Sequence, residues 1–305
     1  MKILVTGGTG FIGTNLVNEL KSRNHEVWVS DLLNHSYENY IRSDVSQIRQ
    51  IQKIFENHQF DYVYNLAAEY GRWNGEDYYE NLWNTNDIGT KNVIRMQEKY
   101  DFKLIDFSSS EVYGDYQGIM SEDIMEKFEI KQMNDYAITK WVNEMQVLNS
   151  AEMFGTKTVR VRPINCYGPH EHYTPYRGFV PKFIYCVLFN KPYTVYSKHT
   201  RTIDYVEDSC RTYANIVDNF ISGEVYNVGG IKDTNIKYIS DLILDYLGKD
   251  DSQVTYKEFE PFTTKDKVID NSKAIKDLDH KPVTTPEEGV KKTIEWFKQF
   301  YKIST

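Results

Sequence analysis

Short apolar runs alternate with helical stretches over the first half of the chain, and this alternation restricts the fold more than any other feature. The runs, rich in β-branched residues, cover 1–5, 25–32, 62–68, 102–107 and 158–162. Between them, apolar residues recur at helical spacing over 13–22, 45–56, 84–99 and 135–153. Strands joined by such helices pair in parallel and are covered on both faces. The pattern therefore predicts an α/β fold with a Rossmann-type, doubly wound parallel sheet.

The second half of the chain has a different pattern, and the change comes near residue 164. Prolines and glycines cluster between 163 and 181. We expect helices over 179–189, 206–220, 236–247 and 287–301, and strands over 193–195, 201–205 and 226–228. A length of 305 residues allows two domains. We predict a first domain over 1–164 and a smaller, loop-rich α/β domain over 165–305, with some segments returning to the first.

Glycines follow the first apolar run in the segment ILVTGGTGFIG. Gly7, Gly10 and Gly13 have the spacing G-x-x-G-x-x-G, between an expected strand and an expected helix. Without side chains, the backbone can approach a pyrophosphate, and the helix N-terminus offers free N–H groups to it. The alternative is an ordinary turn between a strand and a helix. The position favours a dinucleotide site, with Phe11 and Ile12 among its contacts.

Acidic residues follow the second expected strand. Asp31 ends that strand, about 20 residues after the glycines, where a carboxylate binds the ribose hydroxyls of a dinucleotide. A carboxylate repels a 2′-phosphate, so we expect NAD and not NADP. Asp44 and Val45 are the expected adenine contacts. A helix cap is the alternative for Asp31, and a surface turn is the alternative for Asp44.

A tyrosine and a lysine lie four residues apart in the segment YAITK. On a helix, Tyr136 and Lys140 share one face. A nearby ammonium group stabilises phenolate and lowers the pKa of a tyrosine from about 10. Tyr136 is therefore a candidate acid/base for an alcohol, and Lys140 is a candidate ligand for the nicotinamide ribose. A solvated helix face with an aromatic anchor is the alternative.

Further motifs accompany these two. They are NLAA at 65–68, N-x-x-G-T at 86–90, SSSEVYG at 108–114, RPINCYGP at 162–169, RTIDYVED at 201–208 and EVYNVGG at 224–230. Together with the glycine loop and YAITK, they resemble the extended short-chain dehydrogenase/reductase family, in particular its NAD-dependent sugar-nucleotide epimerases and dehydratases. The resemblance covers nearly the whole chain. It implies that residues 1–164 bind NAD and that 165–305 bind a nucleotide-diphosphate sugar.

The resemblance also implies roles for individual residues. Ser109 hydrogen-bonds the sugar and the tyrosine, Tyr136 removes the C4 hydroxyl proton, and Lys140 holds the ribose. The other implied cofactor contacts are Leu66, Ala67, Ala68 and Pro163. The expected substrate contacts are Glu69, Tyr70, Arg72, Asn165, Arg177, Lys182 and Arg201, and among these Asn165 and Arg201 are expected to bind the diphosphate.

Glu111 bears on the reaction that follows oxidation at C4. A 4-epimerase needs only Tyr136 and Ser109, whereas a 4,6-dehydratase needs another acid/base at C5, and a carboxylate is sufficient. Glu111 would face the substrate beside Ser109 if this segment were extended. Many dehydratases of the family have Asp-Glu at the place of Ser110-Glu111. The pair found here resembles GDP-mannose 4,6-dehydratases and UDP-glucuronate decarboxylases.

We interpret the chain as a 4,6-dehydratase in which Glu111 is the additional acid/base and Ser110 lies beside it. A 4-epimerase and a UDP-glucuronate-type decarboxylase are alternatives from the same family. A non-catalytic NAD-binding protein is the alternative from another class. A turn-capping carboxylate is the alternative for Glu111 itself.

Charge and composition exclude several other classes. The chain has 36 basic and 44 acidic residues without a long run of like charge, so we expect no nucleic-acid site. No apolar run approaches the ~20 residues of a membrane span. The N-terminus lacks the features of a signal peptide, and the three cysteines lack disulfide spacing, so we expect a cytoplasmic protein.

Two remaining expectations concern metals and self-association. His170 and His172 lack the spacing of a zinc motif, so we expect no metal site. The resemblance implies a homodimer in which the helices over 84–99 and 135–153 form a four-helix bundle. Met133, Trp141, Met145 and Leu148 are the candidate residues for that face, or they belong to the core.

Overall fold

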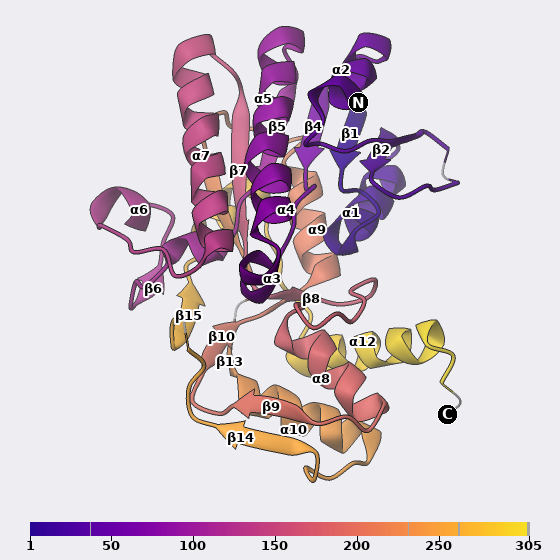
Figure 1. Ribbon diagram of the computed structural model, residues 1–305, viewed down its shortest axis with the longest axis vertical. Coiled ribbons are helices and arrows are strands. Elements are labelled where there is room, and N and C mark those ends of the chain that lie inside the picture. The colour runs from indigo at the N-terminus through magenta and orange to yellow at the C-terminus, as the bar shows by residue number, and fades with distance from the viewer. Residues whose placement is uncertain (37, 231, 262, 304–305) are drawn as a thin grey trace.

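A seven-stranded sheet is the central element of the computed structural model, which describes residues 1–36, 38–230, 232–261 and 263–303. Its strand order is β12-β7-β5-β4-β1-β2-β3, and all neighbouring strands are parallel (Figure 1). The strands are β1 (Lys2–Thr6), β2 (Glu26–Asp31), β3 (Tyr40–Arg42), β4 (Tyr62–Asn65), β5 (Lys103–Phe107), β7 (Thr158–Pro163) and β12 (Val225–Val228). This arrangement confirms the predicted parallel, doubly wound sheet.

Helices cover both faces of this sheet. They are α1 (Phe11–Ser22), α2 (Ile48–Asn57), α5 (Gly89–Tyr100), α7 (Asp135–Phe154), α9 (Val206–Asn215) and α11 (Ser272–Leu278). Along β1, Ile3 and Val5 belong to the core shared with α1 and α9, while Leu4 belongs to the core shared with α2, α5 and α7. Successive strand residues point to opposite faces. Apolar residues at every strand position therefore fill both cores.

A second group of elements lies beneath the large sheet in Figure 1. This group contains a four-stranded sheet of order β13-β10-β15-β6 and two separate two-stranded sheets, β8–β11 and β9–β14. Its elements are β6 (Ile119–Met120), β8 (Cys166–Tyr167), β9 (Tyr193–Tyr196), β10 (Thr200–Thr202), β11 (Asp204–Tyr205), β13 (Asp233–Asn235), β14 (Val254–Lys257), β15 (Asp266–Ile269), α8 (Phe179–Leu188), α10 (Ile236–Leu247) and α12 (Pro286–Phe300). The three helices share one apolar core.

The chain returns to the large sheet after residue 164. Strand β12 pairs with β7, and α9 packs on the core of the large sheet together with α11. The division of the chain into domains 1–164 and 165–305 stays a prediction.

Several elements differ from the sequence-based expectation. The strand expected over 201–205 is divided between β10 and β11, which belong to different sheets. The helix expected over 206–220 ends at Asn215. The helix expected over 84–99 begins with a π-helical turn, η1 (Asn84–Ile88). Short helices were not expected: α3 (Arg72–Asp77), α4 (Tyr79–Trp83), α6 (Ile124–Lys127) and the 3₁₀ helix η2 (Ser110–Tyr113). No helix in the described part of the chain is long and apolar enough to cross a bilayer.

Candidate active site

A cavity of about 650 Å³ opens at the carboxyl ends of the sheet strands and continues toward α8, β10 and β15. This edge is where open α/β sheets bind ligands. Every residue that the sequence predicted as a cofactor, catalytic or substrate contact lines this cavity. The fold therefore brings together side chains that are up to 194 positions apart, from Gly7 to Arg201.

The glycine loop has no room for side chains. A Cβ atom at Gly13 would lie 2.2 Å from the carbonyl oxygen of Gly7, and one at Gly7 would lie 2.7 Å from the backbone nitrogen of Ala67. Gly7 also has a φ of +66°, which disfavours other residues. Helix α1 begins at Phe11, directly after Gly10, and no side chain caps it. The loop therefore presents bare backbone and a helix N-terminus to the cavity, as a pyrophosphate requires.

Asp31 and Asp44 lie farther along the same cavity. Oδ2 of Asp31 accepts hydrogen bonds from the backbone nitrogen and the hydroxyl of Thr9, at 3.0 and 2.6 Å. Asp31 is thus tied to the glycine loop instead of capping a helix. Oδ1 of Asp44 accepts hydrogen bonds from the backbone nitrogen of Ser46 at 2.9 Å and from the hydroxyl of Ser46 at 2.7 Å. These bonds form the surface turn that was the alternative interpretation of Asp44. Both residues, with Val45, line the cavity.

Ser109, Tyr136 and Lys140 meet at the ends of β5 and α7. The hydroxyl of Ser109 lies close enough to the phenol of Tyr136 to favour its ionised form. Nζ of Lys140 donates to the backbone oxygen of Phe107 at 2.7 Å and lies 5.9 Å from the centre of the Tyr136 ring. Only 5% of Lys140 is exposed, so it does not belong to a solvated helix face. The three side chains can act on one alcohol group.

The pKa of Tyr136 lies above its ordinary value. Burial raises it to about 12, and the nearby hydroxyl of Ser109 opposes this rise only in part. The charge of Glu111 adds to the rise in the pKa of Tyr136, and the charge of Arg177 opposes it. Burial also lowers the pKa of Lys140 from its ordinary value. The activation of Tyr136 by Lys140 stays a prediction.

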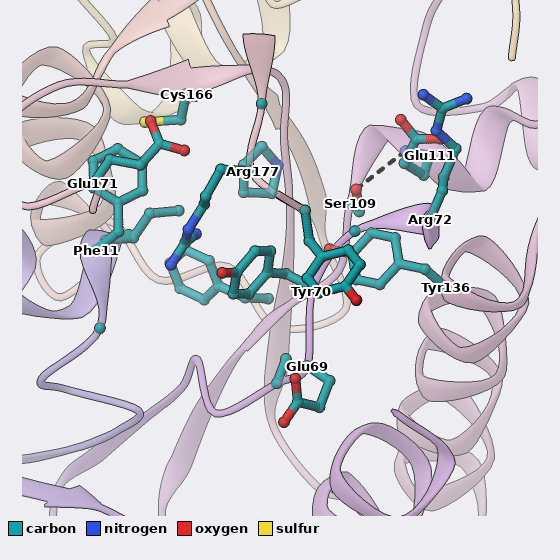
Figure 2. A pocket seen from close by; sticks show the side chains of 18 of the residues that line it. Phe11, Glu69, Tyr70, Arg72, Ser109, Glu111, Tyr136, Cys166, Glu171 and Arg177 are labelled. Carbon is teal, nitrogen blue, oxygen red and sulfur yellow. Dashed lines mark hydrogen bonds between the residues drawn. The ribbon is translucent and has the colours of Figure 1, made fainter. Parts of the chain in front are cut away.

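Glu111 follows Ser109 in a turn and not in an extended segment. Ser110 to Tyr113 form the 3₁₀ helix η2, and the backbone nitrogen of Glu111 donates to Oγ of Ser109 at 3.2 Å (Figure 2). The extended backbone that was expected ends at Ser109, since Ser109 caps this helix. Ser109, Ser110 and Glu111 nevertheless all line the cavity. Val112 and Tyr113 are fully buried beneath them.

The carboxylate of Glu111 forms an ion pair with Lys267 of β15. Burial by itself would raise the pKa of Glu111, but the charges of Lys267, Arg72 and Arg201 outweigh burial and lower the pKa to about 2. Glu111 is therefore ionised throughout the neutral range. An ionised carboxylate thus lies in the same cavity as the phenol of Tyr136.

Comparison with known proteins assigns the chain to a family. Residues 3–229 match the NAD dependent epimerase/dehydratase family. The chain belongs to this family. Its cofactor is NAD, and the bare glycine loop and the carboxylate of Asp31 fit that dinucleotide.

Members with different reactions are similar to this chain. A UDP-N-acetyl-alpha-D-glucosaminuronate decarboxylase from Bacillus cytotoxicus is 30% identical over 98% of each chain. A dTDP-glucose 4,6-dehydratase from Salmonella typhimurium is 28% identical over 97% of this chain and 92% of its own. The solved UDP-glucose 4-epimerase of Thermotoga maritima, with UDP-glucose, is 27% identical with a TM-score of 0.89, covering 99% of this chain and all of its own.

The residues expected to bind substrate all line the cavity, and Arg177 among them also lies 6.0 Å from the ring centre of Phe11, beside the glycine loop. The guanidinium of Arg177 lies 3.6 Å from the centre of the Tyr70 ring, and Arg72 forms an ion pair with Glu260 at 2.8 Å. Asn165 donates to the backbone oxygen of Thr202 at 2.9 Å. Glu69, Tyr70 and Lys182 line the same cavity. The aromatic segment after NLAA therefore contributes directly to the cavity wall.

Arg201 is engaged differently from the expectation. Its terminal nitrogens donate to the backbone oxygens of Thr200, Thr264 and Lys265 at 2.6 to 2.9 Å, and one of them lies 3.0 Å from Nδ1 of His199. These bonds anchor the segment before β15. A bidentate grip by Arg201 on a diphosphate would require their replacement.

Glu171 is a cavity residue that the sequence did not indicate. It lies between His170 and His172, and burial raises its pKa to about 8, with the charge of Arg177 opposing that rise. The two histidine rings pack against Trp296 at 5.5 and 5.2 Å. Within the described ranges, no three His, Cys, Asp or Glu side chains are grouped to hold a metal ion. A glutamate in a loop resembles a solvated residue, so no pattern could have revealed it.

Proposed function

We propose that the chain is an NAD-dependent nucleotide-diphosphate-sugar 4,6-dehydratase. The observation that carries the proposal is the ionised carboxylate of Glu111 beside Ser109, in the cavity that Tyr136 also lines. NAD, when bound, supplies the oxidant that accepts hydride from C4 and later returns it to the sugar. The protein's own groups move the protons.

The first proton comes from the C4 hydroxyl of the sugar. Tyr136 is the proposed base, and the hydroxyl of Ser109 bridges it to the sugar oxygen. Lys140, fixed by the Phe107 carbonyl at the base of α7, is the proposed ligand of the nicotinamide ribose. This step is common to dehydratases, decarboxylases and epimerases of this kind.

The second proton distinguishes the reactions. A C4 ketone acidifies the hydrogen on C5, and an ionised carboxylate can accept that proton. Decarboxylation removes no proton from C5, so a base at this position favours dehydration over decarboxylation.

The substrate's diphosphate needs cations in a chain whose net charge is −8. Arg177 and Lys182 line the cavity, Lys182 from α8, and Asn165, which also lines it, donates to the backbone oxygen of Thr202 on β10. Guanidinium and ammonium groups bind phosphate oxygens through charge-assisted hydrogen bonds. We assign the diphosphate to this region of the cavity.

Decarboxylation of a nucleotide-linked uronate is the second candidate. Ser110 stands where many dehydratases of the family have an aspartate. Around Glu111, the cations Arg72, Arg201 and Lys267 outnumber the carboxylates Glu111 and Glu260. That excess of positive charge could hold a substrate carboxylate. A 4-epimerase, by contrast, leaves the ionised Glu111 without a role.

A panel of UDP-, GDP-, CDP- and dTDP-linked hexoses and uronates separates these reactions by mass spectrometry and NMR. We expect the loss of one water from a hexose. Loss of carbon dioxide from a uronate would support the second candidate, and a new sugar of unchanged mass would indicate epimerisation. Absence of any NAD reduction or product across the panel would contradict both candidates.

Two variants test the proposed roles. Tyr136→Phe should abolish every reaction, since no base remains at C4. Glu111→Gln should keep NAD reduction and lose water elimination by about 10²- to 10⁴-fold, the usual contribution of a general base. Glu126→Gln, an exposed carboxylate on α6, is the control. Full turnover by Glu111→Gln would contradict dehydration through this residue.

A further inference from the structure

Dehydration needs an acid as well as a base. When the C5 proton leaves, the C6 oxygen departs as hydroxide unless a nearby group protonates it, and hydroxide is a poor leaving group. Many dehydratases of the family have an aspartate directly before the glutamate. This chain has Ser110 there, and a serine hydroxyl is not an acid in the neutral range. The acid must come from another element.

Lys267 lies at the required place. Lys267 belongs to β15 and comes 156 positions after the base Glu111 in the sequence. The Nζ atom of Lys267 donates a hydrogen bond to Oε1 of Glu111. Only 4% of Lys267 is exposed, yet it lines the same cavity as Ser109, Glu111 and Tyr136. A C5 hydrogen and a C6 hydroxyl are on adjacent carbons, so the base and the acid of this elimination must also be adjacent.

The position of Lys267 carries a cost to the stability of the fold. In the sheet register, Lys267 lies opposite Arg201 of β10. Two like charges facing each other across neighbouring strands are destabilising, and burying an ammonium group adds to the cost. The ion pair with Glu111 offsets part of this cost, so the lysine is held beside the carboxylate that is the proposed base.

Among the cations near Glu111, the lysine alone can lose a proton. Arg72 and Arg201 also lower the pKa of Glu111, but guanidinium groups stay protonated in proteins. Burial lowers the pKa of Lys267 from its ordinary value, although Glu111 opposes this shift. Burial therefore makes Lys267 a stronger acid than an exposed lysine.

We propose that Lys267 is the catalytic acid that protonates the departing C6 hydroxyl, an inference that rests on the proposed dehydratase function. The C5–H bond breaks, and its proton passes to the carboxylate of Glu111. The electron pair of that bond forms the C5–C6 double bond, and the C6–O bond breaks. The oxygen takes a proton from Nζ of Lys267 and leaves as water.

The charges of the pair favour this exchange. Glu111 and Lys267 begin as an ion pair and end as a neutral acid and a neutral amine, so no net charge is created in a buried site. Loss of the ammonium charge also raises the pKa of Glu111, which then keeps the C5 proton until it is returned to the sugar. The proton that Lys267 gives up is matched by the one that Tyr136 takes from C4, and exchange with solvent restores both groups.

A substrate with a better leaving group tests the proposal. Fluoride leaves without protonation, so the 6-fluoro analogue of the sugar that the wild-type chain dehydrates needs no acid. We expect Lys267→Met to lower kcat for the natural sugar by about 10²-fold or more, with little change in KM. Elimination of fluoride by the same variant should stay within a few-fold of wild type.

Two further variants serve as controls. Lys267→Arg keeps the positive charge and the ion pair but cannot give up a proton, so it should fail on the natural sugar and act on the fluoro analogue. Lys265→Met removes an exposed ammonium group two residues earlier and should behave as wild type. Reduction of NAD by each variant, measured in the same assay, shows that the fold and the C4 oxidation are intact.

Other outcomes would overturn the proposal. Equal losses on the hydroxyl and fluoro substrates would mean that Lys267 only positions Glu111, and so would full activity of Lys267→Arg. A raised KM with unchanged kcat would assign Lys267 to diphosphate binding. If the wild-type chain dehydrates no sugar, the dehydratase function itself fails and the role of Lys267 fails with it.

Discussion

At the scale of the residue, Tyr136 shows how burial competes with neighbouring charge. Desolvation raises its pKa to about 12, and the nearby hydroxyl of Ser109 opposes this rise without reversing it. A base must be deprotonated to act. The oxidised nicotinamide ring carries a positive charge, so NAD binding should move the pKa of Tyr136 back toward the working range.

This competition predicts a pH dependence of the C4 oxidation. Because only phenolate accepts the proton, the rate of NAD reduction should rise about tenfold per pH unit below the pKa of Tyr136 in the complex, and then level off below pH 12. The Glu111→Gln variant isolates this step, and stopped-flow absorbance measures it. A rate independent of pH across the neutral range would show that Tyr136 is not the titrating base.

At the scale of the element, a buried ion network fixes α7 to the sheet. Glu144, one helical turn after Lys140, is fully buried and accepts hydrogen bonds from Arg160 at 3.1 Å and from Arg162 at 2.8 Å. The hydroxyl of Ser108 also donates to it at 2.5 Å. Arg160 and Arg162 lie on β7 and Ser108 follows β5, so one carboxylate joins α7, which carries Tyr136 and Lys140, to both strands.

Removing that carboxylate should destabilise the protein. Glu144→Gln leaves buried guanidinium groups without their counter-charge, which should lower the free energy of unfolding by about 3–5 kcal/mol. Urea unfolding followed by circular dichroism measures this. Glu152→Gln, on the exposed face of the same helix, should change it by less than about 0.5 kcal/mol. Equal stability of the two variants would contradict the role of the network.

The same network predicts the direction of acid unfolding. Burial alone would raise the pKa of Glu144, but the charges of Arg162 and Arg160 outweigh it and lower the pKa from 4.5. A group whose pKa is lower in the folded state than in the unfolded state stabilises the protein above the unfolded pKa of 4.5. This stabilisation is lost as the pH falls through the pKa of Glu144 in the folded state. The stability difference between wild type and Glu144→Gln should therefore shrink below that pH.

At the scale of the whole molecule, the exposed apolar residues of η1 and α7 support the predicted homodimer. Ile88, Met145 and Leu148 are 50%, 45% and 43% exposed, whereas Met133 and Trp141 are partly buried. Apolar residues on one exposed region commonly mark a contact between chains. The homodimer stays a prediction.

Light scattering after size exclusion tests the dimer. The wild-type chain should have the mass of two chains, and a Met145→Glu, Leu148→Glu double variant should have the mass of one, because charges are costly in an apolar contact. Ile275→Glu, which alters an exposed apolar residue of α11, should leave the mass unchanged. A single-chain mass for the wild type would rule out association through this face.

The sequence by itself determined the parallel sheet, the glycine loop and the pair Tyr136 and Lys140. These depend on local patterns, since strand and helix periodicity and the need for bare backbone near a phosphate can be read within about ten residues. The short helices after NLAA and the 3₁₀ turn at Glu111 were missed, because tertiary contacts and not propensity form such short elements.

Only the tertiary structure decided which charges surround the predicted residues. Lys267 lies 156 positions after Glu111 and reaches it because β15 pairs with β10, and burial gives Tyr136, Glu111 and Glu171 pKa values that no sequence pattern encodes. Electrostatic interactions and desolvation depend on distances in space. The chemistry proposed for Glu111 and Lys267 is therefore a property of the fold and not of either motif.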